Sequence, residues 1–424
     1  AMSSATTGTN NVAVGRNALD ANTTASNNTA VGYDSLGANT TGASNTAVGF
    51  SALDANTTGG QNVALGDNAL GANTTADYNT ALGTSTLQLN TTGVNNVATG
   101  AFSLTANTTG DNNVAMGYQA LKSNTTADNN TAIGDQALEF NTTAANNTAV
   151  GYKALTVNTT GTANVGLGAY ALQRNTTAAN NTGVGYDVLG NTTTGANNTA
   201  VGFEALQANT TGDNNVAVGK SALTTNVQGD RNTAIGHSAL KTMNPSGNAD
   251  TYNVAVGYYA GLSVTTGINN TLIGGTSGDA ITTGQQNTGV GRASLGATTT
   301  ANNNSALGYY ALTSNTTGAD NTAIGASALG ANTTASNNTA VGKSALLDNT
   351  TGTLNTALGV QALANNTTGA NNTSVGVNSL YTATTAANNT AVGYLSLFAN
   401  TTGDSSTAVG KDSMKTNTTG RFNS

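Results

Sequence analysis

The chain has 424 residues, of which 19 are acidic and 12 are basic, so charged side chains make up only 7% of it. A surface that binds the phosphate backbone of a nucleic acid needs a basic stripe, which this composition excludes. The chain has no cysteine, so neither a disulfide nor a thiolate metal site can form. Its apolar runs are too short to cross a membrane. We therefore expect no nucleic-acid partner, no membrane insertion and no cofactor.

A short repeat runs through the whole sequence. If the glycine of each "AVG"-like triplet is position 0, this glycine recurs every 17 residues from Gly15 to Gly236 and again from Gly257 to Gly410. The unit reads N-[NT]-[TV]-A-[VIL]-G-x-x-[AS]-L-x-x-N-T-T-[GA]-x, and the chain holds 24 copies. A fixed short period of this kind is typical of a solenoid.

Each copy is expected to contain one short strand. Asparagine, threonine and glycine dominate the unit, and all three form helices poorly. The residues just before each glycine, such as 29–31, are β-branched at alternate positions, which favours a strand. The sequence therefore predicts an all-β fold: one continuous β-solenoid (β-roll) over 1–424, with 24 coils and roughly 115 Å long at about 4.8 Å per coil.

The predicted core follows from which positions are always apolar. Position −1 is apolar in every copy but one, where Thr99 stands, and position +4 is leucine in nearly all copies. Position −3 alternates between threonine and valine, as in Thr29 and Val63. We therefore expect positions −3, −1 and +4 to face inward.

One stretch, 226–281, departs from the pattern. It contains a four-residue insertion within "KTMNPSGNADTYN" and two coils in which Gly261 and Gly278 replace the leucine at +4. A bulge or protruding loop explains this stretch, and a ligand or partner site is the alternative.

Charge is confined to a few positions of the repeat. Apart from Asp250 in the insertion, charged residues occupy only +1, +2, +5, +6, +11 and +12, so we expect those positions to face outward. Positions +7 to +10, around "NTT", carry no charge in any copy. Two interpretations of this uncharged strip compete: a structural corner, or a threonine surface that meets another chain or ice. The candidate surface residues are Thr23, Thr40, Thr57, Thr74, Thr91, Thr108, Thr316, Thr333, Thr350 and Thr367.

Other polar residues give weaker signals. His237, the only histidine, stands at the variable position +1 and is expected to be a surface residue. Asp111 with Asp128, and Asp213 with Asp230, recur at +11 in consecutive copies. Such pairs could hold a cation, but the glycine-rich calcium repeat of β-solenoids is absent. No nucleophile, base and orienting group recur together, so we expect no catalytic site, no metal site and no enzymatic activity.

The stretch Asn28-Thr29-Ala30-Val31-Gly32 and its later counterparts resemble two repeat families. One is the head of YadA-type trimeric autotransporter adhesins, whose repeats read N-S-V-A-I-G. That resemblance implies a left-handed β-roll that stands off a cell surface as a trimer, although the period here is longer because "NTTG" is added. The other is the "NTAVGYxALxxNTTG" array of phage tail-fibre-like and bacterial surface proteins, which covers practically the whole chain.

These observations together predict a non-enzymatic shaft of an extracellular fibre or adhesin, at the cell surface or on a virion. An ice-binding protein is the first alternative, and a filament subunit that stacks end to end is the second. We expect self-association, as a homotrimer or by end-to-end stacking, and a host-surface or ice ligand as a further partner. Because the last copy breaks off after "TTGRFNS", we expect either a piece of a longer fibre or a subunit that stacks head to tail. The alternative is that trimerisation or a local fold-back covers the ends.

Overall fold

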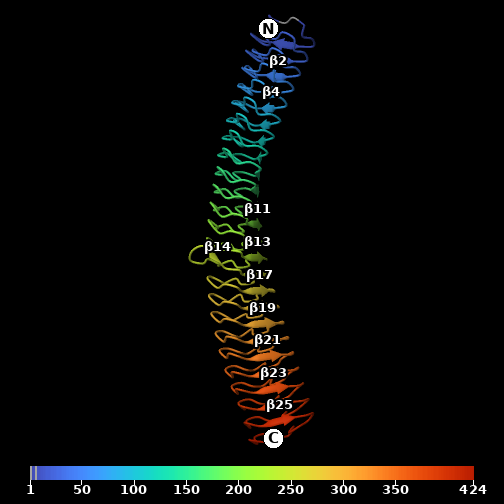
Figure 1. Cartoon of the computed structure of the whole chain (residues 1–424), viewed down its shortest axis with the longest axis vertical. Helices are drawn as coiled ribbons and strands as arrows, with labels where there is room; N and C mark the ends of the chain where they lie inside the picture. Colours follow the sequence, from blue (N-terminus) through green and yellow to red (C-terminus); the bar gives the residue numbers. More distant parts are fainter. Residues whose placement is uncertain (1, 5–6) are drawn as a thin grey trace. The chain divides into compact units, whose positions relative to one another are not determined.

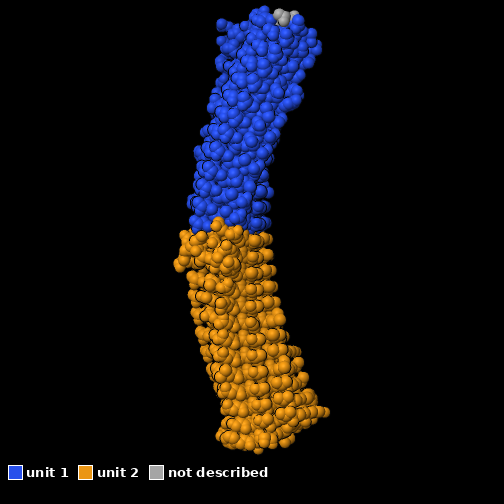
Figure 2. All heavy atoms as spheres, in the orientation of Figure 1, with its two compact units in different colours: residues 1–211 blue, residues 212–424 orange. Residues whose placement is uncertain are grey.

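The structure, a computed structural model, describes residues 2–4 and 7–424, which form β-strands and turns without a helix. It divides into two compact units, residues 1–211 and 212–424, which are coloured separately in Figure 2. Within each unit the short strands lie side by side, one per repeat (Figure 1). The prediction of an all-β solenoid with a 17-residue repeat is thus confirmed.

The described residues of unit 1 form twelve strands of three residues each. They are β1 (Val12–Val14), β2 (Thr29–Val31), β3 (Thr46–Val48), β4 (Val63–Leu65), β5 (Thr80–Leu82), β6 (Val97–Thr99), β7 (Val114–Met116), β8 (Thr131–Ile133), β9 (Thr148–Val150), β10 (Val165–Leu167), β11 (Thr182–Val184) and β12 (Thr199–Val201).

Unit 2 contains twelve strands of the same kind and a pair of two-residue strands. The twelve are β13 (Val216–Val218), β15 (Thr233–Ile235), β17 (Val254–Val256), β18 (Thr271–Ile273), β19 (Thr288–Val290), β20 (Ser305–Leu307), β21 (Thr322–Ile324), β22 (Thr339–Val341), β23 (Thr356–Leu358), β24 (Thr373–Val375), β25 (Thr390–Val392) and β26 (Thr407–Val409). The pair is β14 (Gly229–Asp230) and β16 (Ala249–Asp250).

Consecutive strands in each unit pair in parallel and in register with the repeat. Thr29 lies opposite Thr46, for example, and Val31 lies opposite Val48. The single exception in spacing is at the insertion, where Thr233 of β15 pairs with Val254 of β17. The inserted residues are accommodated by β14 and β16, which pair with each other beside a loop that projects from the stack in Figure 1. The expected protruding loop is therefore confirmed.

The glycine at position 0 allows each coil to turn away from its strand. Gly32 has φ of 139°, a conformation that residues with a side chain rarely adopt. A β-carbon at this glycine would lie 2.1 Å from the carbonyl oxygen of Gly49 in the next coil. Both the backbone conformation and the close stacking therefore require glycine, which explains why this position never varies.

The core contains only some of the residues that the apolar pattern predicted. Position −2, alanine in most copies, is fully buried, as Ala30 and Ala47 illustrate. Position +4 is also fully buried, as predicted, for example at Leu36. Positions −3 and −1 face outward instead, so the prediction that they line the core is wrong. Successive residues of a strand point to opposite faces, and a coil this narrow places the small residue inside.

In most coils two asparagines, at positions −4 and +7, complete the core. Asn28, at position −4, and Asn39, at position +7, are fully buried, and both side-chain amides donate hydrogen bonds to the carbonyl oxygen of Gly42. The Asn28 side chain also accepts a hydrogen bond from the backbone N–H of Asn45 in the next coil, at 2.9 Å. Buried polar groups are tolerated only when they are hydrogen-bonded. The asparagines thus form continuous ladders that join neighbouring coils.

The leucine at position +4 has an unusual backbone conformation. Its φ lies between 48° and 57° in every copy that has leucine, so it is in the left-handed region. β-Branched residues are strongly disfavoured there. This explains why isoleucine and valine never replace leucine at +4, although they are equally apolar.

Candidate functional site

The ten threonines predicted as a surface occupy position +8, the first threonine of each pair. Each of them is half-buried, and its hydroxyl donates a hydrogen bond to the carbonyl oxygen of the threonine at +8 in the next coil. Thr40 donates to Thr57 and Thr333 to Thr350 at 3.0 and 3.1 Å, respectively. The other eight bonds are those of Thr23, Thr57, Thr74, Thr91, Thr108, Thr316, Thr350 and Thr367.

The exposed threonine of each pair is the second one, at position +9. Thr334 and Thr351, for example, are exposed where Thr333 and Thr350 are half-buried. The hydroxyls of the ten candidates thus join coils, and this is the arrangement expected of a structural corner.

A different uncharged surface lies on the outer face of the parallel strands. We call it the sheet face, and it consists of the residues at positions −3 and −1 of every coil. Position −3 is threonine in 16 copies, valine in seven and serine in one, and position −1 is aliphatic or methionine in all but one copy. None of these residues is charged, so the sheet face is a continuous threonine and aliphatic surface in each unit.

Large apolar side chains are unusually exposed on the sheet face. Leu65 is 51% exposed, Leu307 is 50% exposed and Leu358 is 47% exposed. In unit 2 the surface atoms form regular columns across one side of the molecule (Figure 2). Large exposed apolar patches mark interaction sites in many proteins, so the sheet face is a surface from which a role can be inferred.

Sequence reasoning missed the sheet face because it assigned these apolar residues to the core. One signal could have revealed it: position −2 is almost always alanine, glycine or serine, whereas −1 varies in size from valine to methionine. Cores are close-packed and tolerate changes of volume poorly. The position with constant small size was therefore the better candidate for the interior.

The aspartates at +11 have a structural role in this fold. Asp128 accepts a hydrogen bond from the backbone N–H of Asp111 at 2.8 Å, and Asp230 accepts one from Asp213 at 2.7 Å. Asp230 is mostly covered, and burial raises its pKa. Among the described residues no group of three or more acidic or histidine side chains is placed to hold a metal ion.

Most charged residues lie outside, as expected, but Glu139 at position +5 is an exception. It is only 6% exposed, and its carboxylate lies 3.9 Å from the Lys122 ammonium group of the preceding coil. His237 is half-buried rather than freely exposed, and its ring stacks on Tyr258 with centroids 5.5 Å apart.

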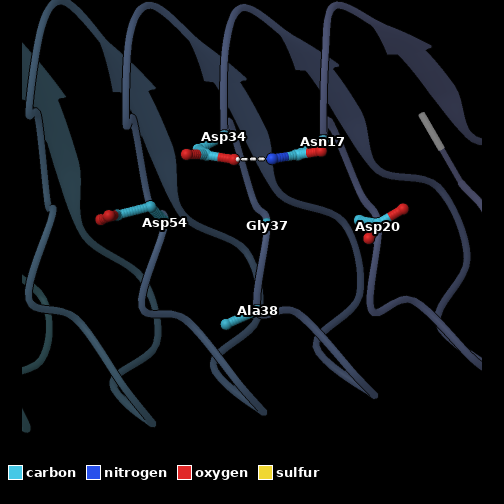
Figure 3. A pocket seen from close by; sticks show the side chains of 6 residues that line it. All are labelled: Asn17, Asp20, Asp34, Gly37, Ala38 and Asp54. Atoms are coloured by element: carbon cyan, nitrogen blue, oxygen red, sulfur yellow. Dashed lines mark hydrogen bonds between the residues drawn. The ribbon is translucent and has the colours of Figure 1, made fainter.

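A shallow acidic hollow in unit 1 is drawn in Figure 3. Asp20, Asp34 and Asp54 line it together with Asn17, whose side-chain amide donates a hydrogen bond to Asp34 at 2.8 Å. Burial raises the pKa of Asp54, and the nearby charge of Asp34 acts in the same direction. A hydrogen bond from the Ser3 hydroxyl lowers the pKa of Asp20. The three carboxylates come from separate coils, and nothing among them forms a catalytic arrangement.

A comparison with protein-family models finds no match for the chain, and a comparison with curated protein sequences finds none either. The described part of the chain contains no helix long and apolar enough to cross a membrane. The role of the protein must therefore be inferred from its coils and from the surfaces described above.

Proposed function

We propose that the protein is the structural shaft of an extracellular fibre, of the bacterial-surface or phage tail-fibre type, and that its chains associate through the sheet face. The proposed role is mechanical and non-enzymatic. The sheet face is the observation that carries the proposal. It repeats in register on every coil and presents exposed aliphatic side chains without a single charge.

The occupant proposed for the sheet face is a second copy of the same chain. Two copies present columns with the same coil spacing, so their side chains can interdigitate along many coils. The face carries no charge and exposes an aliphatic residue or methionine at −1 in all but one coil, and depletion of charge is typical of the core of an interface. The uncharged strands also need no ionic partner, which favours self-association over binding to a charged ligand.

The hydrogen bonds between neighbouring coils support a load-bearing role. Within each unit, neighbouring coils are joined by strand pairing, and in most coils also by asparagine side chains and by threonine hydroxyls at +8. Stability in such repeat folds arises mainly from contacts between neighbouring repeats. A shaft needs this property, because force along its length must pass from coil to coil.

Localisation of the protein in its source tests the proposal directly. Antibodies against the purified chain, used for immunogold electron microscopy of intact cells and virions, should label filaments at the outer surface. Label found only inside cells would contradict the proposal. Sedimentation of the purified protein supplies an independent measurement of self-association.

Ice binding is a second candidate because the threonines of the sheet face are in register. In unit 2, position −3 is threonine or serine in every coil from Thr271 to Thr407, which makes a regular hydroxyl column. Measurement of thermal hysteresis separates the two functions. A shaft should depress the freezing point only colligatively, whereas an ice-binding protein should separate the freezing and melting points.

A further inference from the structure

Aromatic side chains at position +1 stack on one another in neighbouring coils. The rings of Tyr33 and Phe50 are 5.3 Å apart with planes 8° from parallel, and those of Tyr186 and Phe203 are 5.4 Å apart at 11°. Aromatic rings favour offset stacking at such centroid distances. The spacing of the coils is therefore also a suitable spacing for stacked rings.

Where the side chain at position +1 is small, the residue at +2 can fill the space between the +1 side chains of the two neighbouring coils. Ala169 stands between Tyr152 and Tyr186, and the ring of Tyr170, at position +2, occupies the space beside it. The Tyr170 ring lies 5.3 Å from that of Tyr152 and 5.7 Å from that of Tyr186. The aromatic column is thus continuous across this coil.

In unit 2, Gly275 leaves a gap at position +1 that is not filled. It is the only glycine at position +1, and no heavy atom lies within 4 Å of the place that its β-carbon would take. The residue at +2 is Thr276, which has no ring. The flanking residues at +1 are Tyr258 in the preceding coil and Arg292 in the following coil. We call this space the Gly275 gap.

The backbone around the Gly275 gap keeps the regular spacing of the fold. The N–H of Thr276 donates to the carbonyl oxygen of Tyr258 at 2.8 Å, and the N–H of Ala293 donates to that of Gly275 at 3.0 Å. Tyr258 and Arg292 are therefore two coils apart, which is roughly 9–10 Å at the usual spacing of paired chains. One planar ring at the level of Gly275 fits this interval.

Both walls of the gap are held in place by neighbours. The Tyr258 ring is 55% exposed and stacks on the Tyr259 ring with centroids 3.9 Å apart. On the other side, Nη1 of Arg292 donates hydrogen bonds to the hydroxyls of Tyr309 and Tyr310 at 3.2 and 3.0 Å. Walls that are ordered in advance lose little conformational entropy when a ligand binds.

We propose that the Gly275 gap binds a planar aromatic ring that carries a carboxylate. The ring stacks on Tyr258 at the level of Gly275, and its carboxylate meets the guanidinium group of Arg292, whose carbon already lies 5.8 and 5.5 Å from the centroids of the Tyr309 and Tyr310 rings. Because Nη1 already bonds two tyrosines, Nε and Nη2 of Arg292 provide the donors for the carboxylate. The site needs no movement of the fold, and it does not depend on the proposed role as a shaft.

The absence of tryptophan from the chain gives a simple test. Indole-3-acetate, a planar ring with a carboxylate, is titrated with the full chain while its indole fluorescence is recorded. Saturable binding is expected. Gly275→Tyr, which fills the gap with the chain's own ring, and Tyr258→Ala, which removes one wall, should each weaken binding roughly tenfold or more, in line with the usual strength of ring stacking.

Matched variants and probes complete the design. Val360→Tyr adds the same side chain at position +1, between Lys343 and Val377, which offer no ring, and should leave binding unchanged. Arg292→Gln should weaken binding of indole-3-acetate more than binding of neutral indole. Circular dichroism of every variant establishes that the strands are retained, which is expected because tyrosine occurs at +1 in many coils.

Three results would overturn the proposal: no saturable binding of indole-3-acetate, binding that survives Gly275→Tyr, or equal binding of cyclohexanecarboxylate, which has no planar ring.

The source of the natural ring is resolved by a second probe, the dipeptide Gly-Trp. Tighter binding of the dipeptide than of indole-3-acetate assigns the gap to a terminal aromatic residue of a partner protein, and the reverse assigns it to a free small molecule.

Discussion

A β-carbon on Gly278 would lie 2.6 Å from Cδ2 of Leu272. Leu272 stands at position −2, where most other coils have alanine, and Gly278 stands at +4, where most other coils have leucine. The large inward side chain has thus moved from one position of the coil to the other. Ile281 and Val264, both fully buried at +7, fill the remaining space in this part of unit 2.

This exchange predicts that the two positions are energetically coupled. Leu272→Ala should destabilise the protein by about 2–5 kcal/mol, because no leucine at +4 can fill the cavity. Gly278→Leu alone should cost about 1–3 kcal/mol through overpacking. The double variant restores the residues of the ordinary coil and should be more stable than the sum of the single effects indicates. Denaturant unfolding of the four proteins measures this coupling, and simple additivity would contradict it.

The left-handed conformation at +4 gives a second prediction. Leu329, with φ of 50°, is fully buried. Leu329→Ile preserves volume and hydrophobicity but places a β-branched residue in the left-handed region. It should therefore lower the free energy of unfolding by about 1–3 kcal/mol. Leu329→Met is the control and should cost less than about 1.5 kcal/mol, since Met414 has the same conformation with φ of 48°. Equal losses of unfolding free energy for the two variants would show that side-chain packing, and not the backbone conformation, determines which residue type stands at +4.

The threonine pair distinguishes a structural corner from a binding surface. Thr333, Thr350 and Thr367 donate their hydroxyls to the next coil, so replacing each by valine should cost about 0.5–1.5 kcal/mol. The matched control replaces the exposed neighbours at +9, namely 334, 351 and 368, and should change the midpoint of thermal unfolding little. Replacement of the same three residues at +8 by lysine tests whether this strip, and not the sheet face, binds ice. Loss of thermal hysteresis with an intact fold would favour ice binding at +8, and loss of folding would favour the structural corner.

Much of this fold could be predicted because the repeat fixes it. The recurrence of Gly15, Gly32 and their counterparts determines the length of each coil, and identical coils pair in register. The position of the loop also follows, because the insertion is the one interruption of the period. Leu36 and its equivalents were correctly assigned to the core for the same reason.

The orientation of each strand could not be derived in the same way. In a three-residue strand, such as Thr29–Val31, either the middle residue or its two neighbours can face inward, and hydrophobicity favours the neighbours. The width of the coil decides the outcome, and that width is set by the turns at Gly32, Asp34 and Leu36, all with positive φ. The sheet face was missed because it depends on this choice. The Gly275 gap was missed because it appears only when neighbouring coils are compared.

The partly covered aspartate at 279 predicts a dependence of stability on pH. Burial raises the pKa of Asp279 above its ordinary value of 3.8, so the folded protein favours the protonated carboxyl group. Its contribution is therefore most favourable below the unfolded pKa and is lost as pH rises through the folded pKa. Asp279→Asn should raise the midpoint of thermal unfolding at neutral pH, and this gain should disappear in acid. A gain that is the same at both pH values would rule out ionisation as its cause.

The last prediction concerns the sheet face as a surface for self-association. Ile324 and Leu358 stand at position −1, two coils apart, and are 39% and 47% exposed. Replacing both by lysine adds two charges that must be desolvated if a second chain covers them, which is unfavourable unless each charge is paired. Sedimentation should therefore show a shift from oligomer to monomer for this double variant.

The control places lysine in the same two coils but away from the sheet face. Ser327 and Gln361 stand at position +2, which accepts lysine elsewhere in the chain, at Lys153. Ser327→Lys with Gln361→Lys has the same net charge as the sheet-face variant, so a general charge effect on association would appear in both. An effect confined to 324 and 358 identifies the sheet face as the interface. A wild-type protein that sediments as a monomer at every concentration would remove self-association from the proposed function. The variant with lysine at 324 and 358 would then test whether the sheet face binds ice.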